Sequence, residues 1–520
     1  MVRGARRINL YLASFVGAAG TLFSRVLGAA RDVVIGHLFG AGAAADAFWM
    51  AFTVPSVFRR FVADEGLTGA LIPAVSRAER DEGVESARRL AGATLVALFV
   101  AGVVLCGAGA LAAPWLVRLF APGFVADPEK LELTITLTRW LFPFILFVSL
   151  VSFCEGLLNR RGHFFVPKIA PGLVSGSIAA SAWFLYDRFE EPVFALVPGV
   201  LIGGAAHLVV CLPPLLRIWG PLRLNLAGLR SQWFAQLAGE MGKVVAIGAF
   251  AQVNIIVLRS LASLLPPGSV TQYWYATRMV DLAQGAVAVG VSSAALPLLA
   301  ENVAGKDWIA FRATFSRSVR LIALVLFPVA ALLVVLGLPA VRLLFEHGEF
   351  TPADSVAAAR TLTGLLPFML AVAGINIVKK AFFALDDRWT LIWVGGLGVL
   401  LTALFGGGLA IGFGLEIRGL ALGLSISSLM QLATYLFVLE RRTEGACELA
   451  ALVSPLTRTA AAAMPAGVTA WVLLTWVPLP PGRLFDAAGL CLAGGIGVAV
   501  FAGVARLLGV EEVKAVWGRG

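Results

Sequence analysis

Charged residues stand inside one apolar stretch near the start of the chain, residues 24–65. They include Arg25, Arg31, Asp32, Asp46, Arg59, Arg60 and Glu65. One arginine at the centre of a bilayer costs about 2.5–3.5 kcal/mol on the mildest scale, so four would cost on the order of 10 kcal/mol without compensation. Such residues usually face a bundle interior or a hydrated cavity. Because the planar guanidinium donates two parallel hydrogen bonds to a phosphate, the stretch predicts a cationic cavity for an anionic, phosphorylated ligand.

The composition of the chain is that of a polytopic membrane protein. Of its 520 residues, 59% are hydrophobic and 14% are charged, where a soluble protein has roughly 25% charged residues. The mean hydropathy is +0.88. At about 20 apolar residues per span, the length allows up to about 14 transmembrane helices. The net charge of +10 does not indicate nucleic-acid binding, because the basic residues lie between apolar spans, where cytoplasmic membrane edges collect them.

The five cysteines and four histidines show no catalytic or metal-binding pattern. No two cysteines form a CxxC motif and no histidines form HExxH, so packing inside apolar runs is the favoured role for the cysteines. We expect no metal site, no cofactor and no enzymatic activity. The energy source, whether an ion or the membrane potential, is left open.

Apolar runs divide the chain into fourteen expected spans. They lie near residues 8–39, 44–73, 90–113, 132–158, 164–186, 193–216, 237–264, 270–298, 321–345, 356–384, 389–413, 416–439, 455–477 and 484–508. The second span is expected to be interrupted at Pro55, and residues 76–89 and 306–320 are expected to be charged loops. The first span is expected to stay uncleaved, although it begins like a signal peptide. Loop charges place both termini in the cytoplasm.

An internal repeat relates two halves of the chain. Phe48-Trp49-Met50-Ala51 matches Tyr273-Trp274-Tyr275-Ala276, an offset of 225 residues, and segments 114–120 and 339–345 are alike. Six spans per half make the repeats parallel, which is typical of two lobes rocking about a central site. We therefore expect an N-terminal lobe over residues 1–220, a second lobe over 221–440 that begins with an interfacial linker, and an appendage over 441–520 with the last two spans.

Several segments resemble the MurJ (MviN) family of lipid II flippases, in the multidrug/oligosaccharidyl-lipid/polysaccharide exporter superfamily. They are SRVLGAARD, GAGAAADAF, RRFVADEG, APGF and YATRM, and the likeness runs from about residue 8 to 508. It implies alternating access that moves the undecaprenyl-pyrophosphate-linked peptidoglycan precursor from the cytoplasmic to the periplasmic leaflet of the bacterial inner membrane. The implied partners are lipid II and membrane lipids, and the cell-wall synthesis machinery is a further candidate partner. The last two spans would form a groove for the polyprenyl tail.

The resemblance also implies roles for individual residues. Arg25, Arg31, Arg59 and Arg278 occupy the positions of the family's cavity arginines, and Asp32, Asp46 and Glu65 match its acidic positions. We expect the four arginines to bind substrate. Five residues are expected to support or gate that site: Ser24, Asp32, Asp46, Arg60 and Glu65. Some members bind sodium through acidic and amide groups in spans 7, 11 and 12, but span 11 here offers only Thr402.

Structural roles compete with these assignments. Arg25 and Arg31 could pair with Asp32 or Asp46 to fix helix packing, and Arg278 could pair with Asp281, three residues on and near the same helical face. Arg60 could extend to the interface instead of the cavity. For the chain as a whole, the alternative functions are a cation-coupled exporter of the same superfamily and, ranked low, a membrane glycosyltransferase. A cationic drug favours carboxylates rather than arginines, and the glycosyltransferase lacks a loop long enough for a catalytic domain.

Overall fold

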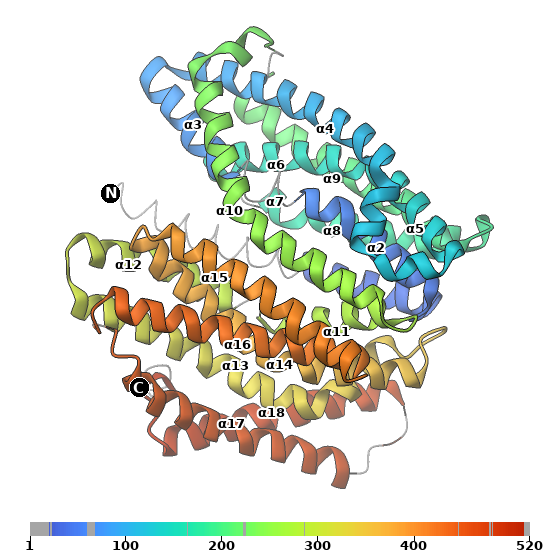
Figure 1. Ribbon diagram of the computed structural model, residues 1–520, viewed down its shortest axis with the longest axis vertical. Helices are drawn as coiled ribbons and strands as arrows, with labels where there is room; N and C mark the ends of the chain where they lie inside the picture. The colour runs from blue at the N-terminus through green and yellow to red at the C-terminus, as the bar shows by residue number, and fades with distance from the viewer. Residues whose placement is uncertain are drawn as a thin grey trace. The chain divides into compact units, whose positions relative to one another are not determined.

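The computed structural model describes residue 20 and residues 23–59, 68–163, 165–221, 225–284, 287–445, 447–477, 480 and 482–513. Throughout these ranges the ordered elements are helices, with no strand. Arg60 and Glu65 lie outside the described residues. The chain divides into two compact units, residues 1–270 and 271–520, and each is described by itself (Figure 1). The three-part division expected from the repeat stays a prediction.

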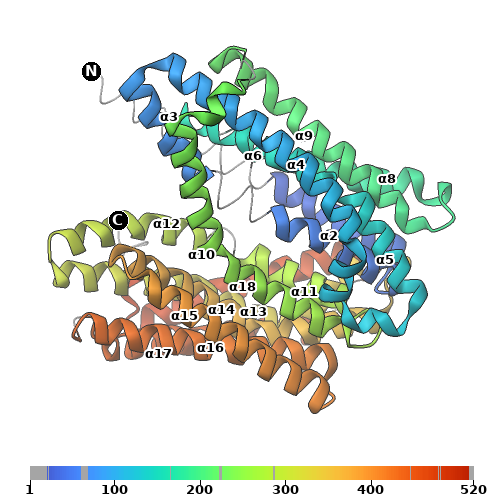
Figure 2. The same ribbon diagram turned by 45° about the horizontal axis from the view of Figure 1, so that its top comes forward.

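Unit 1 begins with a helix over residues 23–39. Its further helices are α2 (Ala43–Arg59), α3 (Thr68–Glu82), α4 (Val84–Phe120), η2 (Pro122–Ala126), α5 (Pro128–Leu141), α6 (Phe144–Arg160), α7 (Phe165–Ile169), α8 (Pro171–Leu185), η3 (Tyr186–Arg188), η4 (Pro192–Ala195), α9 (Leu196–Trp219), η5 (Ala227–Arg230) and α10 (Gln232–Ser263). Helices α8 and α9 pack side by side, as both ribbon views show (Figure 2).

Unit 2 holds most of α11 (Ser269–Gln284), whose first two residues fall in unit 1. Its other elements are α12 (Val287–Ala304), α13 (Trp308–Phe345), α14 (Pro352–Ala384), α15 (Arg388–Leu401), the π-helical turns η6 (Thr402–Gly406) and η7 (Gly408–Gly412), α16 (Glu416–Arg442), α17 (Ala450–Trp476) and α18 (Arg483–Leu507). Gly423 of α16 lies so close to η6 that a Cβ there would meet the Gly406 backbone at 2.4 Å. Gly406 and Gly423 therefore serve close packing of α16 on η6.

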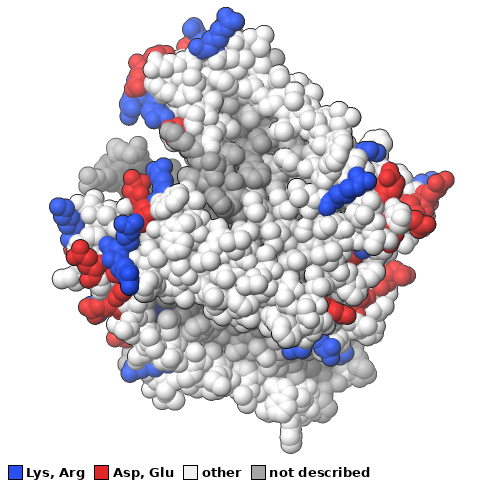
Figure 3. Space-filling model, viewed as in Figure 1, with Lys and Arg blue, Asp and Glu red and all other residues white. Residues whose placement is uncertain are grey.

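Within the described ranges, ten helical segments are long and apolar enough to cross a membrane. They correspond to the expected spans 3–6 and 9–14, and they establish a multi-pass membrane protein. The expected spans 1, 2 and 8, which carry the expected site residues, run partly through residues outside the described ranges, and span 7 is not among the ten. The total of fourteen stays a prediction. On the face drawn in Figure 3, charged side chains gather towards helix ends and leave the long middle faces of the helices white.

Three local expectations were wrong. Helix α2 runs through Pro55 and ends at Arg59, because one missing N–H frees only one carbonyl in a well-packed helix. Residues 76–89 are helical apart from Gly83, whose φ of +90° joins α3 directly to α4. Residues 308–320 form the start of α13, with Asp307 capping its first turn. Charge density marked these segments as membrane edges, but it did not break the helices.

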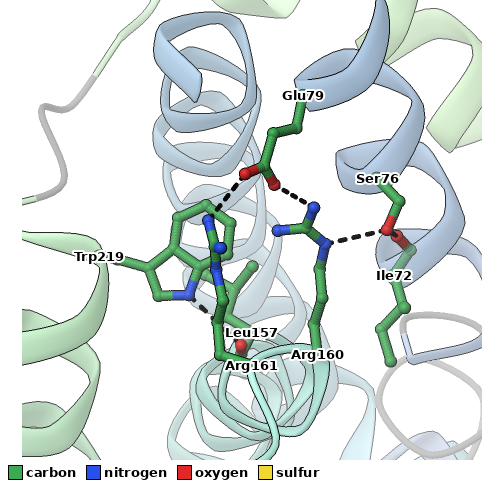
Figure 4. A network of polar contacts seen from close by, with 7 residues as sticks. All are labelled: Ile72, Ser76, Glu79, Leu157, Arg160, Arg161 and Trp219. Carbon is green, nitrogen blue, oxygen red and sulfur yellow. Dashed lines mark hydrogen bonds and ion pairs between the residues drawn. The ribbon is translucent and has the colours of Figure 1, made fainter. Parts of the chain in front are cut away.

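A polar network holds the end of α3 against α6 and α9 (Figure 4). Glu79 pairs with both Arg160 and Arg161, the Arg160 Nε donates to Ser76 Oγ at 2.9 Å, and the Trp219 ring lies 5.0–5.4 Å from the two guanidinium carbons. Beside it, an apolar core joins α3, α4, α6 and α9. These contacts anchor the segment of chain that follows the undescribed residues 60–67.

The opposite end of unit 1 depends on one close backbone approach. A Cβ on Gly123 would stand 2.1 Å from the Ser263 carbonyl oxygen, and the Gly123 N–H donates to Ser263 Oγ at 3.0 Å. Ser260 Oγ donates to the Leu119 carbonyl at 2.8 Å. The APGF turn therefore needs glycine so that the end of α10 can dock on the end of α4, which places α10 in unit 1.

Candidate functional site

Arg31 is held in a fixed position by its neighbour in sequence and by α2. Its Nε and Nη2 donate to the same Asp32 oxygen at 2.9 and 2.6 Å. Both side chains are more than nine-tenths buried, and the guanidinium carbon lies 5.6 Å from the centre of the Trp49 ring. Asp32 therefore orients the Arg31 guanidinium. The planar cation stays buried because a carboxylate and an aromatic face compensate its lost hydration.

Two other cavity arginines lie in unit 1. Arg25 is half-buried on the helix of Arg31, seven residues before Asp32 and so on the Asp32 side of that helix. Ser24 is also half-buried and lies where α8 approaches most closely, because a Cβ on Gly172 would come within 3.3 Å of its Cα. Arg59 is the last residue of α2 and is partly buried. No contact measured among the described residues joins Arg25 or Arg59 to Arg31.

Asp46 connects three segments of unit 1. One of its oxygens accepts from Lys130 Nζ of α5 at 2.9 Å and from the Gly268 backbone N–H at 2.7 Å. The Asp46 and Lys130 side chains are 1% and 7% exposed, and Lys130 also lies 4.1 Å from the Phe124 ring centre. Gly268 has a φ of +90°, a conformation that glycine adopts without strain. Asp46 thus ties the start of α2 to α5 and to the turn after α10.

In unit 2, Arg278 repeats part of the Arg31 arrangement with a looser partner. Its Nη1 lies 3.6 Å from an Asp281 oxygen, and its guanidinium carbon lies 4.4 Å from the Trp274 ring centre. The Arg278 and Asp281 side chains are 35% and 65% exposed. The Asp281 pairing weighed as a structural alternative is therefore present. Trp274 is the repeat equivalent of Trp49, so each unit sets an arginine beside an acid and over the same tryptophan position.

Several buried or half-buried ionisable residues escaped the sequence reasoning. Among them are Lys130, Glu155, His207 and Arg259. Glu155 could have been found, because it stands alone among apolar residues of an expected span. Lys130 could not have been found, because nothing in its spacing predicts a partner 84 residues away. No group of three or more His, Cys, Asp or Glu side chains suited to a metal is found in the described part of the chain.

Comparison with known proteins decides the family. The model of the lipid II flippase MurJ family matches residues 35–483. The chain belongs to that family. Family membership agrees with the resemblance seen in the sequence, and the matched range includes Asp46, Arg59 and Arg278 but begins after Arg25, Arg31 and Asp32.

Relatives and solved structures agree with the family. A lipid II flippase MurJ of Burkholderia cenocepacia is 30% identical over 397 residues, 76% of this chain and 77% of the relative. A probable lipid II flippase MurJ of Vibrio cholerae is 27% identical over 538 residues, 98% of both chains. The fold is similar to a lipid II flippase MurJ in an inward closed conformation, with a TM-score of 0.75 at 18% identity, over 94% of this chain and 98% of the other. It is also similar to an inward-facing multidrug resistance MATE transporter of the MOP superfamily, with a TM-score of 0.69 at 14% identity, over 84% and 99%.

Proposed function

We propose that this protein is a lipid II flippase of the bacterial cytoplasmic membrane and not an enzyme. The family match over most of the chain carries the proposal, and relatives of this chain are named flippases. The substrate is then the undecaprenyl-pyrophosphate-linked peptidoglycan precursor, moved from the cytoplasmic to the periplasmic leaflet.

The arginines supply the chemistry that such a substrate needs. A pyrophosphate carries its charge on oxygens that match the guanidinium fork. In this proposal Arg25, Arg31, Arg59 and Arg278 bind the pyrophosphate, and Ser24, Asp32, Asp46, Arg60 and Glu65 support or gate the site. Arg31 is the best prepared of them, because Asp32 and Trp49 already fix its plane. Its Nη1 makes no hydrogen bond to Asp32, which leaves one edge of the fork for an anion.

Transport requires the site to open to one side of the membrane at a time, which we propose occurs by alternating access of the two units. A ligand shifts such an equilibrium only by its differential affinity for the two states. Distances between paired spin labels, one at Ala74 in unit 1 and one at Leu298 in unit 2, should change when lipid II is added. An unchanged distance distribution at full lipid occupancy would contradict alternating access.

The decisive test of the function is replacement of the resident flippase. The protein should sustain growth and cell shape when expressed in a cell depleted of its own lipid II flippase. Purified protein in liposomes should move labelled lipid II between leaflets. Failure of both, with normal membrane insertion, would move the assignment to a cation-coupled exporter, which the MATE-like fold also accommodates. That exporter should instead extrude cationic drugs in the same liposomes.

We propose that both termini lie in the cytoplasm, because this orientation puts most Lys and Arg residues of the loops on the cytoplasmic side. A cysteine at Glu190, an exposed residue between α8 and α9, should react with an impermeant thiol reagent from the periplasm. A cysteine at Gly305, exposed between α12 and α13, should react only after the cells are opened. Cys491 is exposed in the structure, so the parent protein for labelling should carry Cys491→Ala.

A further inference from the structure

An ionisable pair lies in the membrane-embedded part of unit 1 and takes no part in the arginine site. His207 Nε2 of α9 stands 3.3 Å from Glu155 Oε1 of α6. The two helices pack directly on each other, and both lie in segments apolar enough to span a membrane. The His207 side chain is 9% exposed and that of Glu155 is 25% exposed.

The surroundings of the pair are apolar and closely packed. A Cβ on Gly204, one turn before His207, would meet the Phe144 and Phe147 side chains at 3.1–3.2 Å. The titratable groups that the structure sets against Glu155 are the buried thiols of Cys154 and Cys211. Helix α8, which packs along α9, carries no charged residue. None of the hydrogen bonds and ion pairs found among the described residues joins the pair to Arg31 or Asp46.

Stability alone does not account for two such residues. A buried ion pair is often no more stabilising than apolar side chains of the same volume, and this interface is otherwise built from apolar and small residues. Ionisable residues within membrane spans are by default functional, and acidic and histidine side chains there often carry protons. Histidine is the side chain whose unperturbed charge change falls between pH 5 and 8.

We propose that Glu155 and His207 form a proton-binding site that loads and unloads during the transport cycle. The proposal rests on the transport function above. In the loaded form the imidazolium faces the carboxylate and the pair is neutral overall. On release the Nε2 proton passes to water, and a neutral imidazole remains beside the carboxylate. Asn159 lies one turn beyond Glu155 towards the end of α6, and its Oδ1 is a buried acceptor without a partner among the described residues. This oxygen provides a polar group that the released proton can pass on its way to the end of α6.

Proton binding can be measured directly, because the chain has four histidines. The protein is labelled with nitrogen-15 histidine in detergent, and His207→Gln assigns the His207 signals. In the wild type His207 should change protonation state between pH 5 and 9. In Glu155→Gln the pH response of the His207 signals should differ from the wild type, because the amide carries no charge to face the imidazole, while the signals of His37, His163 and His347 stay unchanged. A His207 that keeps one state across this range overturns the proposal.

Coupling to transport needs a second measurement, the pH dependence of lipid II movement in liposomes. The wild-type rate should vary with pH across the His207 titration, and Glu155→Gln and His207→Gln should each flatten that variation. Cys211→Ser changes the same interface without removing either member of the pair and should keep the wild-type profile. Variants that retain the wild-type profile overturn the coupling. A wild type that moves no lipid II at any pH contradicts the transport function instead, and the histidine titration still decides whether the pair binds protons.

Discussion

Arg31 in unit 1 and Arg278 in unit 2 share a plan but differ in how firmly they are held. Each lies over a tryptophan at the same repeat position and beside an acid. Arg31 makes two short hydrogen bonds in a buried setting, whereas Arg278 has a 3.6 Å contact with an acid that is 65% exposed. A buried, doubly bonded cation is pre-organised, while an exposed ion pair is weak and exchanges partners at little cost. We infer that the Arg31–Asp32 pair is held more firmly than the Arg278–Asp281 pair.

The largest effect is expected at Arg31. Arg31→Ala should lower lipid II transport on the order of 100-fold or more, because each charge-assisted hydrogen bond contributes about 1.5–3 kcal/mol and the buried ion pair with Asp32 is broken. Arg31→Lys should recover part of the rate, since it restores the charge but not the fork. Transport is measured in liposomes at matched protein content. Arg342→Ala is the control, because its pairing with Glu346 lies outside the site.

Wild-type transport by Arg31→Ala would show that Arg31 does not bind the substrate. Arg25→Ala and Arg59→Ala should also abolish complementation, and normal growth with either would remove that residue from the site. Arg278→Ala should lose less, on the order of tenfold, because in the proposal it reinforces a pyrophosphate already captured by unit 1.

This ranking of the arginines could not have come from the sequence. Helical spacing places Arg25, seven residues before Asp32, on the Asp32 side of helix 23–39. Adjacent residues do not share a face, yet the long Arg31 side chain folds back to Asp32. Long flexible side chains reach partners that backbone periodicity does not predict.

Hydropathy predicted the membrane spans well. The ten described segments that qualify on length and hydropathy each match an expected span. The pairing of Lys130 with Asp46 could not be predicted in this way. The two residues are distant in sequence, and only the packing of α2 on α5 brings them together. Hydropathy therefore finds the scaffold, and tertiary structure is needed to find the site.

The acids beside the two arginines sharpen the comparison. Asp32→Asn should reduce transport by about tenfold or more, because the Arg31 guanidinium loses the charge that orients it in a buried position. Asp281→Asn should change transport by less than about threefold, because an exposed pair contributes about 0–1 kcal/mol. Both variants are measured in the same liposomes with matched orientation. Equal losses in the two would show that Arg278 is as fixed as Arg31.

Asp46 and Lys130 provide a buried pair whose role is to join segments. Asp46→Asn or Lys130→Met alone should destabilise the protein by about 3–5 kcal/mol, because each leaves a buried charge without its partner. The double variant should lose less than the sum of the single variants, since it leaves neither charge behind. Thermal unfolding in detergent measures the three variants. Additive losses would show that the two side chains do not stabilise each other.

The smallest effect is expected at Glu79. This residue lies in a cluster of charged side chains at the end of α3, beyond the apolar part of the expected span. Burial raises the pKa of the Glu79 carboxyl, but the hydrogen bond and charge of Arg160 and the charge of Arg161 outweigh it, so the pKa lies below its ordinary value of 4.5. A carboxyl with a lowered folded-state pKa contributes stability above its unfolded pKa and loses it as pH falls through the folded pKa. Glu79→Gln should therefore unfold slightly earlier than wild type at pH 7, by about 1 kcal/mol or less. That difference in stability should close as the pH falls below 4.5.

Unfolding temperatures of wild type and Glu79→Gln from pH 7 to pH 3 measure this difference. The control is Glu85→Gln, whose i,i+4 partner Arg89 is exposed. A gap that stays constant over this range would show that Glu79 stabilises α3 by packing rather than by its charge.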